Sequence, residues 1–170
     1  MMSPIKRWVG RNLGLALMCL VASSGCGPRA LPLGPAGVVT TVGGASVIFY
    51  QWKGGPAVMI FSDVQGGHSS AGGGTAGSLY KEQGFESSPD GRRFEWQMET
   101  TDGRNIQFRL DGKEYDLSKG TLFLVKTKGG KTEVEQLSRD LSAVSPDANG
   151  CKDFAQKDPA VSQFLGAGAN

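Results

Sequence analysis

The residues from Arg92 to Leu137 decide the fold of this chain, and their sequence is RRFEWQMETTDGRNIQFRLDGKEYDLSKGTLFLVKTKGGKTEVEQL. Between Arg92 and Thr101 apolar and polar residues alternate, which is the two-residue period of a half-buried strand. Three dipeptides that favour hairpin turns interrupt the pattern. They are Asp102-Gly103, Asp111-Gly112 and Gly129-Gly130. The stretch therefore predicts a β-meander.

Each strand predicted in this stretch has one apolar face. The apolar residues are Phe94, Trp96 and Met98, then Ile106, Phe108 and Leu110, then Tyr115 and Leu117. The run Leu122–Val125 is apolar on both faces, so we expect it to be the most buried strand. Residues of the segment Lys131–Leu137 also recur at helical spacing, but a Gly-Gly turn just before it favours a strand.

Two further strands are predicted upstream, at Ala45–Trp52 and Ala57–Val64, with a turn at residues 53–56 and a shorter strand at Val38–Val42. Both longer strands are apolar on both faces. That composition indicates a sheet covered on two sides, or strands that face the meander across a sandwich. Tyr50, Trp52 and Phe61 are interpreted as core residues, because aromatic side chains at strand spacing usually fill a core. A ligand-stacking role is the alternative.

Residues 65–78 contain six glycines and little that could pack, so the segment is predicted to be a flexible loop. Its stretch Gly72–Gly77 fits the pattern G-x-G-x-x-G. Phosphate binding by that pattern requires a strand running directly into it and a helix after it, and neither is predicted here. His68, the only histidine, is expected to be solvated, with general acid or base work as the alternative. Residues 84–91 are expected to form a polar connector.

The chain from Ser145 onward is the part predicted to be helical. Four residues could share one helical face: Cys151, Phe154, Val161 and Leu165. Pro159 argues against a single uninterrupted helix. We expect Asp158 to cap a short second helix, with Pro159 in its first turn and Gly166 at its end.

The N-terminal segment is typical of a secretory signal. Lys6, Arg7 and Arg11 precede the uncharged, apolar stretch Leu13–Ala22, and Ser23-Ser24-Gly25-Cys26 follows. The apolar stretch is about half the roughly 20 residues that a helix needs to cross a bilayer. A permanent transmembrane helix is therefore not expected.

The small residues that lead into Cys26 resemble the lipobox of bacterial lipoproteins, with Ser23 where Leu or Val is usual. The resemblance implies cleavage between Gly25 and Cys26 and a diacylglycerol on the Cys26 thiol. Because Gly27 follows instead of Asp, it also implies the outer membrane if the host has two membranes. The alternative is an ordinary cysteine near a conventional cleavage site, in which case a disulfide between Cys26 and Cys151 becomes the rival.

Cleavage changes the charge of the chain. The whole sequence carries +2, from 18 Lys and Arg and 16 Asp and Glu, but three of the basic residues and none of the acidic ones precede Cys26. The mature chain would therefore carry −1. No Lys/Arg cluster remains that could follow a phosphate backbone, so nucleic-acid binding is not expected.

The expected organisation is a signal peptide at residues 1–25, a lipid-anchored tether at 26–37, a β-rich domain at 38–165 and a frayed tail at 166–170. Three prolines in the tether indicate a semi-extended segment. We predict a mainly β fold: a single-domain antiparallel meander that forms a small sandwich or partly closed barrel, with a short C-terminal helical segment.

The predicted function is that of an exported, membrane-anchored lipoprotein. Its expected role is a non-enzymatic binding or structural module of the cell envelope, held to the membrane through Cys26 and contacting an envelope protein partner. The sequence identifies no catalytic set, no metal ligands and no cofactor motif. The alternative is a small-ligand-binding protein or hydrolytic enzyme with a site near the Gly-rich loop 65–78.

Overall fold

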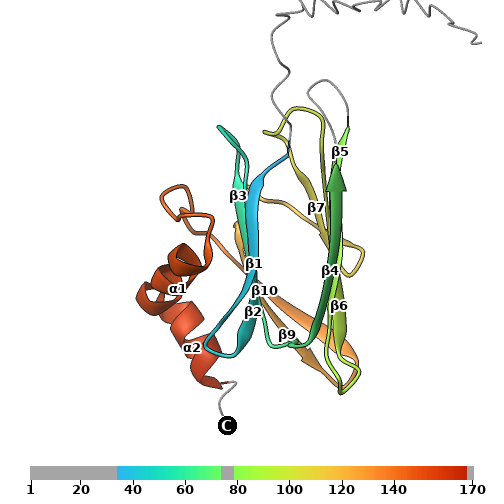
Figure 1. Cartoon of the computed structure of the whole chain (residues 1–170), viewed down its shortest axis with the longest axis vertical. Coiled ribbons are helices and arrows are strands. Elements are labelled where there is room, and N and C mark those ends of the chain that lie inside the picture. Colours follow the sequence, from blue (N-terminus) through green and yellow to red (C-terminus); the bar gives the residue numbers. More distant parts are fainter. Residues whose placement is uncertain (1–33, 74–78, 168–170) are drawn as a thin grey trace, which may run out of the picture.

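A computed structural model describes residues 34–73 and 79–167, and it is mainly β (Figure 1). The described chain contains ten strands and two helices. The strands are β1 Ala36–Val42, β2 Ala45–Gln51, β3 Ala57–Ser62, β4 Gly67–Gly73, β5 Tyr80–Ser87, β6 Arg93–Thr100, β7 Gln107–Leu110, β8 Lys113–Tyr115, β9 Leu122–Lys128 and β10 Lys131–Leu137. The helices are α1 Ala148–Lys157 and α2 Pro159–Ala167.

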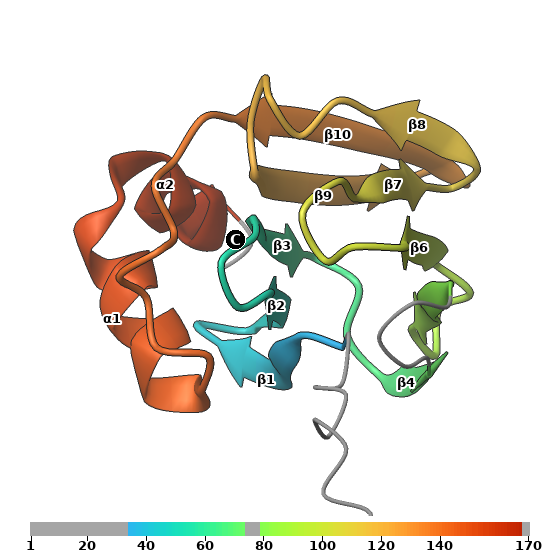
Figure 2. The same cartoon turned by 90° about the horizontal axis from the view of Figure 1, so that it is seen from above.

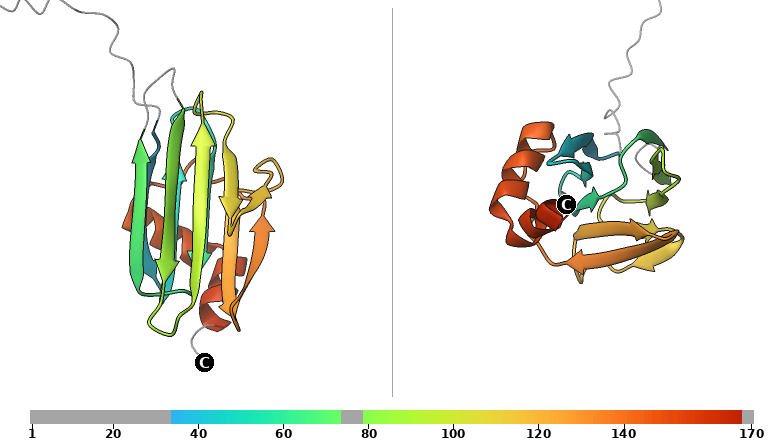
Figure 3. Two further views of the ribbon diagram at one scale, coloured as in Figure 1. Left: turned by 90° about the vertical axis from the view of Figure 1, so that its right-hand side faces the viewer. Right: turned by 90° about the horizontal axis from the view of Figure 1, so that it is seen from below.

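The strands form two five-stranded sheets. Sheet A has the order β1-β2-β3-β9-β10, and sheet B has the order β4-β5-β6-β7-β8. Sheet B is antiparallel throughout, and its long strands lie side by side in the left view of Figure 3. Sheet A is antiparallel except at its centre, where β3 and β9 are parallel. The expected sandwich is confirmed, and the two sheets do not close into one.

The molecule has three layers, with helices α1 and α2 on one face of sheet A and sheet B on the other (Figures 1 and 2). This arrangement explains why β2, β3 and the first half of β9 are apolar on both faces. All six residues of β3 are buried, and so is the run Leu122–Val125 of β9. The expectation of a sheet covered on two sides is confirmed.

The two faces of sheet A contribute to two separate cores. One core lies under the helices and includes Phe49, Phe61 and Cys151. The other lies between the sheets and includes Ile60, Trp96 and Phe123. The aromatic residues predicted for the core are buried, with Tyr50 7%, Trp52 2% and Phe61 0% exposed.

The Arg92–Leu137 stretch does not form one meander, and that prediction is wrong in its second half. Strands β6, β7 and β8 pair in sequence within sheet B, but the chain then crosses to sheet A, where β9 lies next to β3. The physical reason is the composition of Leu122–Val125. A strand that is apolar on both faces has to lie in the sheet that both layers cover.

Two of the three predicted hairpin turns are present. Asp111-Gly112 and Gly129-Gly130 have positive φ at both central residues, as a type I′ turn requires. Asp102-Gly103 does not form a two-residue turn, because a longer loop joins β6 to β7. There the Asp102 carboxylate accepts the backbone N–H groups of Arg104 and Asn105, both at 2.8 Å, and the local side-chain bonds replace a tight turn.

The prediction that residues 65–78 form a loop is wrong for 67–73, which are β4, and residues 74–78 lie outside the described part. The polar connector predicted at 84–91 is also wrong in its first half, since β5 extends to Ser87. Glycine has low strand propensity, but β4 is held as a strand by its antiparallel pairing with β5.

The helical break at Asp158 is confirmed. The Asp158 carboxylate accepts the N–H groups of Ala160 and Val161 at 2.9 and 3.1 Å, with Pro159 as the first residue of α2. The four residues predicted for one helical face all belong to the core under the helices. Helix α2 runs past Gly166 to Ala167, one residue beyond its expected end.

Several predictions concern residues 1–33, which lie outside the described part of the chain. These are the signal peptide, the lipid-attachment residue Cys26 and most of the tether. The described chain starts at Gly34, and β1 begins at Ala36, within the segment expected to be tether. Gly34 lies against the ring of Tyr80. Strand β1 starts at the end of the sandwich opposite helix α2 (Figure 1).

Gly84 allows the close approach of β4, β5 and β6, and its replacement should destabilise the fold. A Cβ at this position would overlap the ring of Trp96 and lie 2.6 Å from the backbone oxygen of Ser69. We expect Gly84→Ala to lower the free energy of unfolding by about 1–3 kcal/mol, measured by urea denaturation. The control Gly166→Ala meets no atom within 4 Å and should not destabilise the protein. Equal midpoints for Gly84→Ala and wild type would contradict the packing described.

Candidate functional site

A group of polar side chains lies between the two sheets, at the side of the sandwich where β1 and β4 run (Figure 2). Alternate residues of β5 face this space: Tyr80, Glu82, Gly84 and Glu86. Glu82 is 7% exposed and Glu86 is 2% exposed. A buried carboxylate is costly unless it is hydrogen-bonded, so the partners of these two residues define the site.

Glu82 accepts hydrogen bonds from two tyrosines. The hydroxyl of Tyr50 donates to Oε1 at 3.0 Å, and the hydroxyl of Tyr80 donates to Oε2 at 2.7 Å. Burial first, and then the Glu82 carboxylate, raise the pKa of both phenols well above the ordinary value of 10. For Tyr50 the hydroxyl of Ser70 opposes this rise to a smaller extent. Both tyrosines are therefore neutral donors.

Glu86 has its partners on two other strands. Its Oε1 accepts the hydroxyl of Ser46 at 2.8 Å and lies 3.2 Å from Nδ1 of His68. The other ring nitrogen of His68, Nε2, lies 3.2 Å from Oγ of Ser70. The His68 ring also stacks on Trp96, with 5.5 Å between ring centroids and 12° between planes.

The strand register explains how these groups meet. His68 on β4 is paired directly with Glu86 on β5, and Ser70, two residues further along, points to the same face as His68. Gly72 completes this face, and only glycine fits there because a Cβ would overlap the Glu82 carboxylate. The Gly- and Ser-rich composition of β4 thus leaves room for the side chains of β5.

His68 is exposed, as expected, together with the rest of β4. Its ring is also held in place, since the side chain is 29% exposed and both ring nitrogens have hydrogen-bond partners. Asp63, the acidic residue nearest to it in the preceding sequence, is not part of the site. It pairs with Arg92 at 3.3 Å and accepts the backbone N–H of Thr127 at 3.0 Å. Within residues 34–73 and 79–167, no three His, Cys, Asp or Glu side chains are placed to hold a metal ion.

The glycine pattern Gly72–Gly77 does not have the setting that phosphate binding requires. Gly72 and Gly73 belong to strand β4, and the remaining residues of the pattern lie outside the described part. The next described element is strand β5, which begins at Tyr80, so the segment leads from strand to strand. Among the described residues, no helix follows the pattern whose N-terminus could meet a phosphate.

Cys151 is fully buried in the core under the helices. Burial, with a smaller effect of Asp147, raises the pKa of its thiol to about 11. Among the described residues it forms no disulfide. Cys26, its alternative partner, lies outside them.

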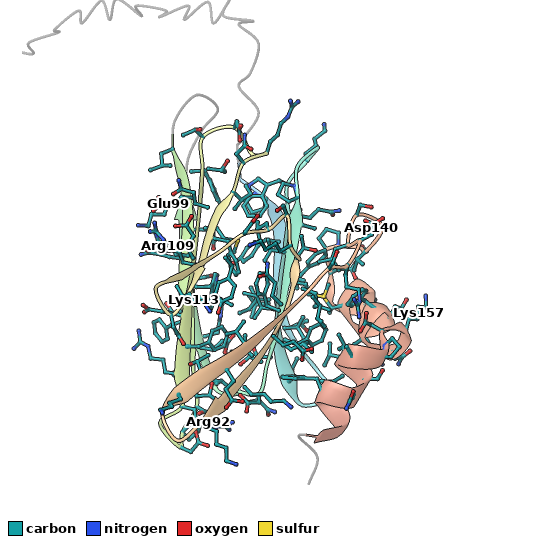
Figure 4. All side chains as sticks on the ribbon, turned by 180° about the vertical axis from the view of Figure 1, so that it is seen from behind. Arg92, Glu99, Arg109, Lys113, Asp140 and Lys157 are labelled. Atoms are coloured by element: carbon teal, nitrogen blue, oxygen red, sulfur yellow. The ribbon has the colours of Figure 1, made fainter. Side chains whose placement is uncertain are left out.

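Two surface hollows lie close to the polar site. One, of about 330 Å³, is lined by Ala71, Phe85 and Arg93 of sheet B and also by the site residues Ser70 and Trp96, among others. Figure 4 shows Glu99 and Arg109 pointing outward from sheet B. The other, of about 580 Å³, is lined by Leu79, Arg104 and Leu117, among others.

Comparison with protein-family models, with curated proteins and with solved structures gives no match. No relative therefore supplies an activity or a set of site residues for this chain. None of the described helices has both the length and the apolar composition that a membrane span needs.

Four of the site residues carry no motif that sequence reasoning would single out: Ser46, Ser70, Glu82 and Glu86. One signal was present in the alternation Tyr80-x-Glu82-x-Gly84-x-Glu86, which has the period of a strand. It is hard to recognise because a buried strand face is normally apolar. The pattern becomes meaningful only when the Tyr50 and His68 side chains are placed opposite it.

Removing the charge of Glu82 should make the two buried tyrosines ionise at lower pH. In the wild type, we expect Tyr50 and Tyr80 to form phenolate only well above pH 10, because burial and Glu82 both oppose ionisation. Their stabilising contribution is complete below the unfolded-state pKa and is lost as pH rises through the raised folded-state pKa. In Glu82→Gln both pKa values should fall towards 10, measured by phenolate absorbance.

The matched control is Glu99→Gln, which changes a carboxylate that pairs with Lys81 instead of the tyrosines. Its phenolate titration should follow the wild type. A Glu82→Gln titration that also follows the wild type would show that the carboxylate does not act on the phenols.

Proposed function

We propose that this protein is an exported lipoprotein, anchored at Cys26, that serves as a binding module of the cell envelope. The observation that carries the proposal is the basic and apolar segment ending in Ser23-Ser24-Gly25-Cys26. Two or three acyl chains would hold the protein firmly, since each buried methylene contributes about 0.8 kcal/mol and a single chain binds only marginally. In a host with two membranes, the outer membrane is the proposed location.

Strand β4 is the proposed binding surface, because it is a sheet edge without the usual protection. Edge strands are commonly blunted by charge, proline or short length. Strand β10 carries Lys131, Glu133 and Glu135, and β8 has only three residues. Strand β4 has seven residues, all exposed, with no Asp, Glu, Lys, Arg or Pro among them. Such an edge suits the addition of an extended peptide strand.

The proposed occupant is an extended segment of another envelope protein. The eight residues after Cys26, up to Gly34, span at most about 26 Å. A second copy added antiparallel through β4 would be inverted and would carry its own Gly34 at the opposite end of the strands. The seven residues of β4 are about 24 Å long, so the two copies of Gly34 would differ in height by nearly the full reach of one tether. Both copies could then be anchored in the same membrane only with a fully extended tether. A separate partner has no such restriction.

Replacing the acylated cysteine should release the protein from the membrane. In Cys26→Ser we expect no incorporation of labelled palmitate and loss of partitioning into the detergent phase. Cys151→Ala is the control and should keep both properties, because its thiol is buried in the domain. A mature N-terminus that begins with an unmodified Cys26, seen by mass spectrometry, would contradict the anchor.

The β4 edge should contact a partner in intact envelopes. A photo-crosslinking residue at Ala71 should give one discrete adduct with another protein, and the additional change Ser69→Lys should abolish it by charging the edge. The control position is Thr132 on the charged edge strand β10, where no such adduct is expected. An adduct only with a second copy of this chain, or none at Ala71, would contradict the proposed partner.

A further inference from the structure

Three side chains at the open side of the sandwich are arranged as a nucleophile, a base and an orienting carboxylate. Oγ of Ser70 lies 3.2 Å from Nε2 of His68, and Nδ1 of the same ring lies 3.2 Å from Oε1 of Glu86. We propose that Ser70, His68 and Glu86 form an acyl-transfer site that hydrolyses short-chain carboxylic esters. This goes beyond the binding role proposed above and does not depend on the lipid anchor.

The position of the His68 ring is determined by contacts on two sides. Its face stacks on the buried Trp96, and its Nδ1 meets Glu86, which is itself held by the hydroxyl of Ser46 at 2.8 Å. A carboxylate can only accept, so Nδ1 is assigned as the protonated nitrogen. Nε2 then has its lone pair directed at the hydroxyl of Ser70, which is the tautomer that a general base for serine needs.

The burial of the three groups matches their proposed roles. Glu86 is 2% exposed and is therefore shielded from water, while the His68 side chain is 29% exposed and Ser70 is exposed. The reacting hydroxyl can thus be reached from solvent, and the carboxylate that orients the base cannot. Glu82, the other buried glutamate, has both oxygens bonded by phenols and takes no part.

The substrate class follows from the surroundings of Ser70. Its neighbours Ser69 and Ala71 are small, and β4 is the outermost strand of sheet B. An edge strand presents alternate backbone N–H groups without ladder partners, and those near Ser70 are the donors available to a developing oxyanion. The hollow of about 330 Å³ is lined in part by Ser70 and Trp96, and its volume is at the small end of the range for ligand pockets, so a short acyl group fits better than a long one.

The reaction balances with water as the only co-reactant. Ser70 Oγ attacks the ester carbonyl carbon while its proton passes to Nε2 of His68, and the imidazolium is stabilised by Glu86. The carbon–oxygen bond to the leaving alcohol breaks, and the alcohol takes the proton from Nε2. Water then attacks the acyl-serine, with His68 as base, and releases the carboxylic acid and the free serine. Net, one ester and one water give one acid and one alcohol.

The test uses the full-length protein in detergent micelles with two probes, an alkyl fluorophosphonate and p-nitrophenyl acetate. Mass spectrometry should place the phosphonate on Ser70 alone, and Ser70→Ala should abolish labelling. His68→Gln and Glu86→Gln should each slow labelling and ester hydrolysis at least tenfold. Ser142→Ala, which changes an exposed serine distant from the site, should react like the wild type.

Folding is followed by urea denaturation of each variant, so that a rate loss is compared only between folded proteins. If His68→Gln or Glu86→Gln lowers the unfolding midpoint but leaves phosphonylation of Ser70 unchanged, the three residues are structural and the proposal fails. Equal labelling of native and urea-unfolded protein, or labelling spread over several serines, overturns it as well. Either failure leaves the Cys26 and Ala71 experiments unaffected, so the binding role is tested separately.

Discussion

The burial of sheet A on both of its faces is the constraint on which the rest of the structure depends. Successive residues of β2 and β3 alternate between the two cores, with Phe49 and Phe61 under the helices and Ile48 and Ile60 between the sheets. Neither layer could be removed without exposing a continuous apolar surface to water. Sheet B and the two short helices are thus required by the same three central strands, which explains how a short chain supports three layers.

The sequence predicts those parts of the fold in which apolar residues are buried and polar residues are exposed. Strand β6 was recognisable because Phe94, Trp96 and Met98 alternate with polar residues, and all three are buried as expected. The break between α1 and α2 was recognisable because Asp158 and Pro159 are a capping residue and a first-turn residue. No local sequence pattern indicates the parallel pairing of β3 with β9. Which strands pair depends on how side chains pack across the whole sheet and not on the residues of one segment.

Strands β4 and β5 escaped sequence reasoning for two different physical reasons. Strand β4 consists of residues that seldom form strands, and it is held by its pairing with β5 and by its histidine. Strand β5 turns Tyr80, Glu82 and Glu86 into a space that is normally apolar. Polar side chains of the two strands bond to each other, as His68 does to Glu86. The strand conformation of each segment can therefore be explained only when the other segment is paired with it. The candidate site could not be predicted for the same reason: the single histidine is visible in the sequence, but its contacts with Glu86 and Ser70 appear only when the two strands are paired.

The contacts at this open side connect the two sheets and also supply the geometry of the proposed acyl-transfer site. Glu82 and Glu86 connect sheet B to the Tyr50 and Ser46 side chains of sheet A, so the buried carboxylates hold the two layers together where no closing strand does. A histidine fixed between a buried carboxylate and a serine hydroxyl is also an arrangement with reactive character. The desolvation cost of the two buried carboxylates is offset by hydrogen bonds to both oxygens of Glu82 and to Oε1 of Glu86.

The parallel contact between β3 and β9 has a consequence for the order of folding. The paired residues Met59 and Leu122 are about 60 positions apart, and the five strands between them belong to the other sheet. The centre of sheet A therefore cannot assemble until most of the polypeptide has been made, and domains dominated by such non-local pairings fold slowly. For the exported lipoprotein proposed above, slow acquisition of structure is an advantage, because a chain that crosses a bilayer as an extended thread has to stay unfolded until it is translocated.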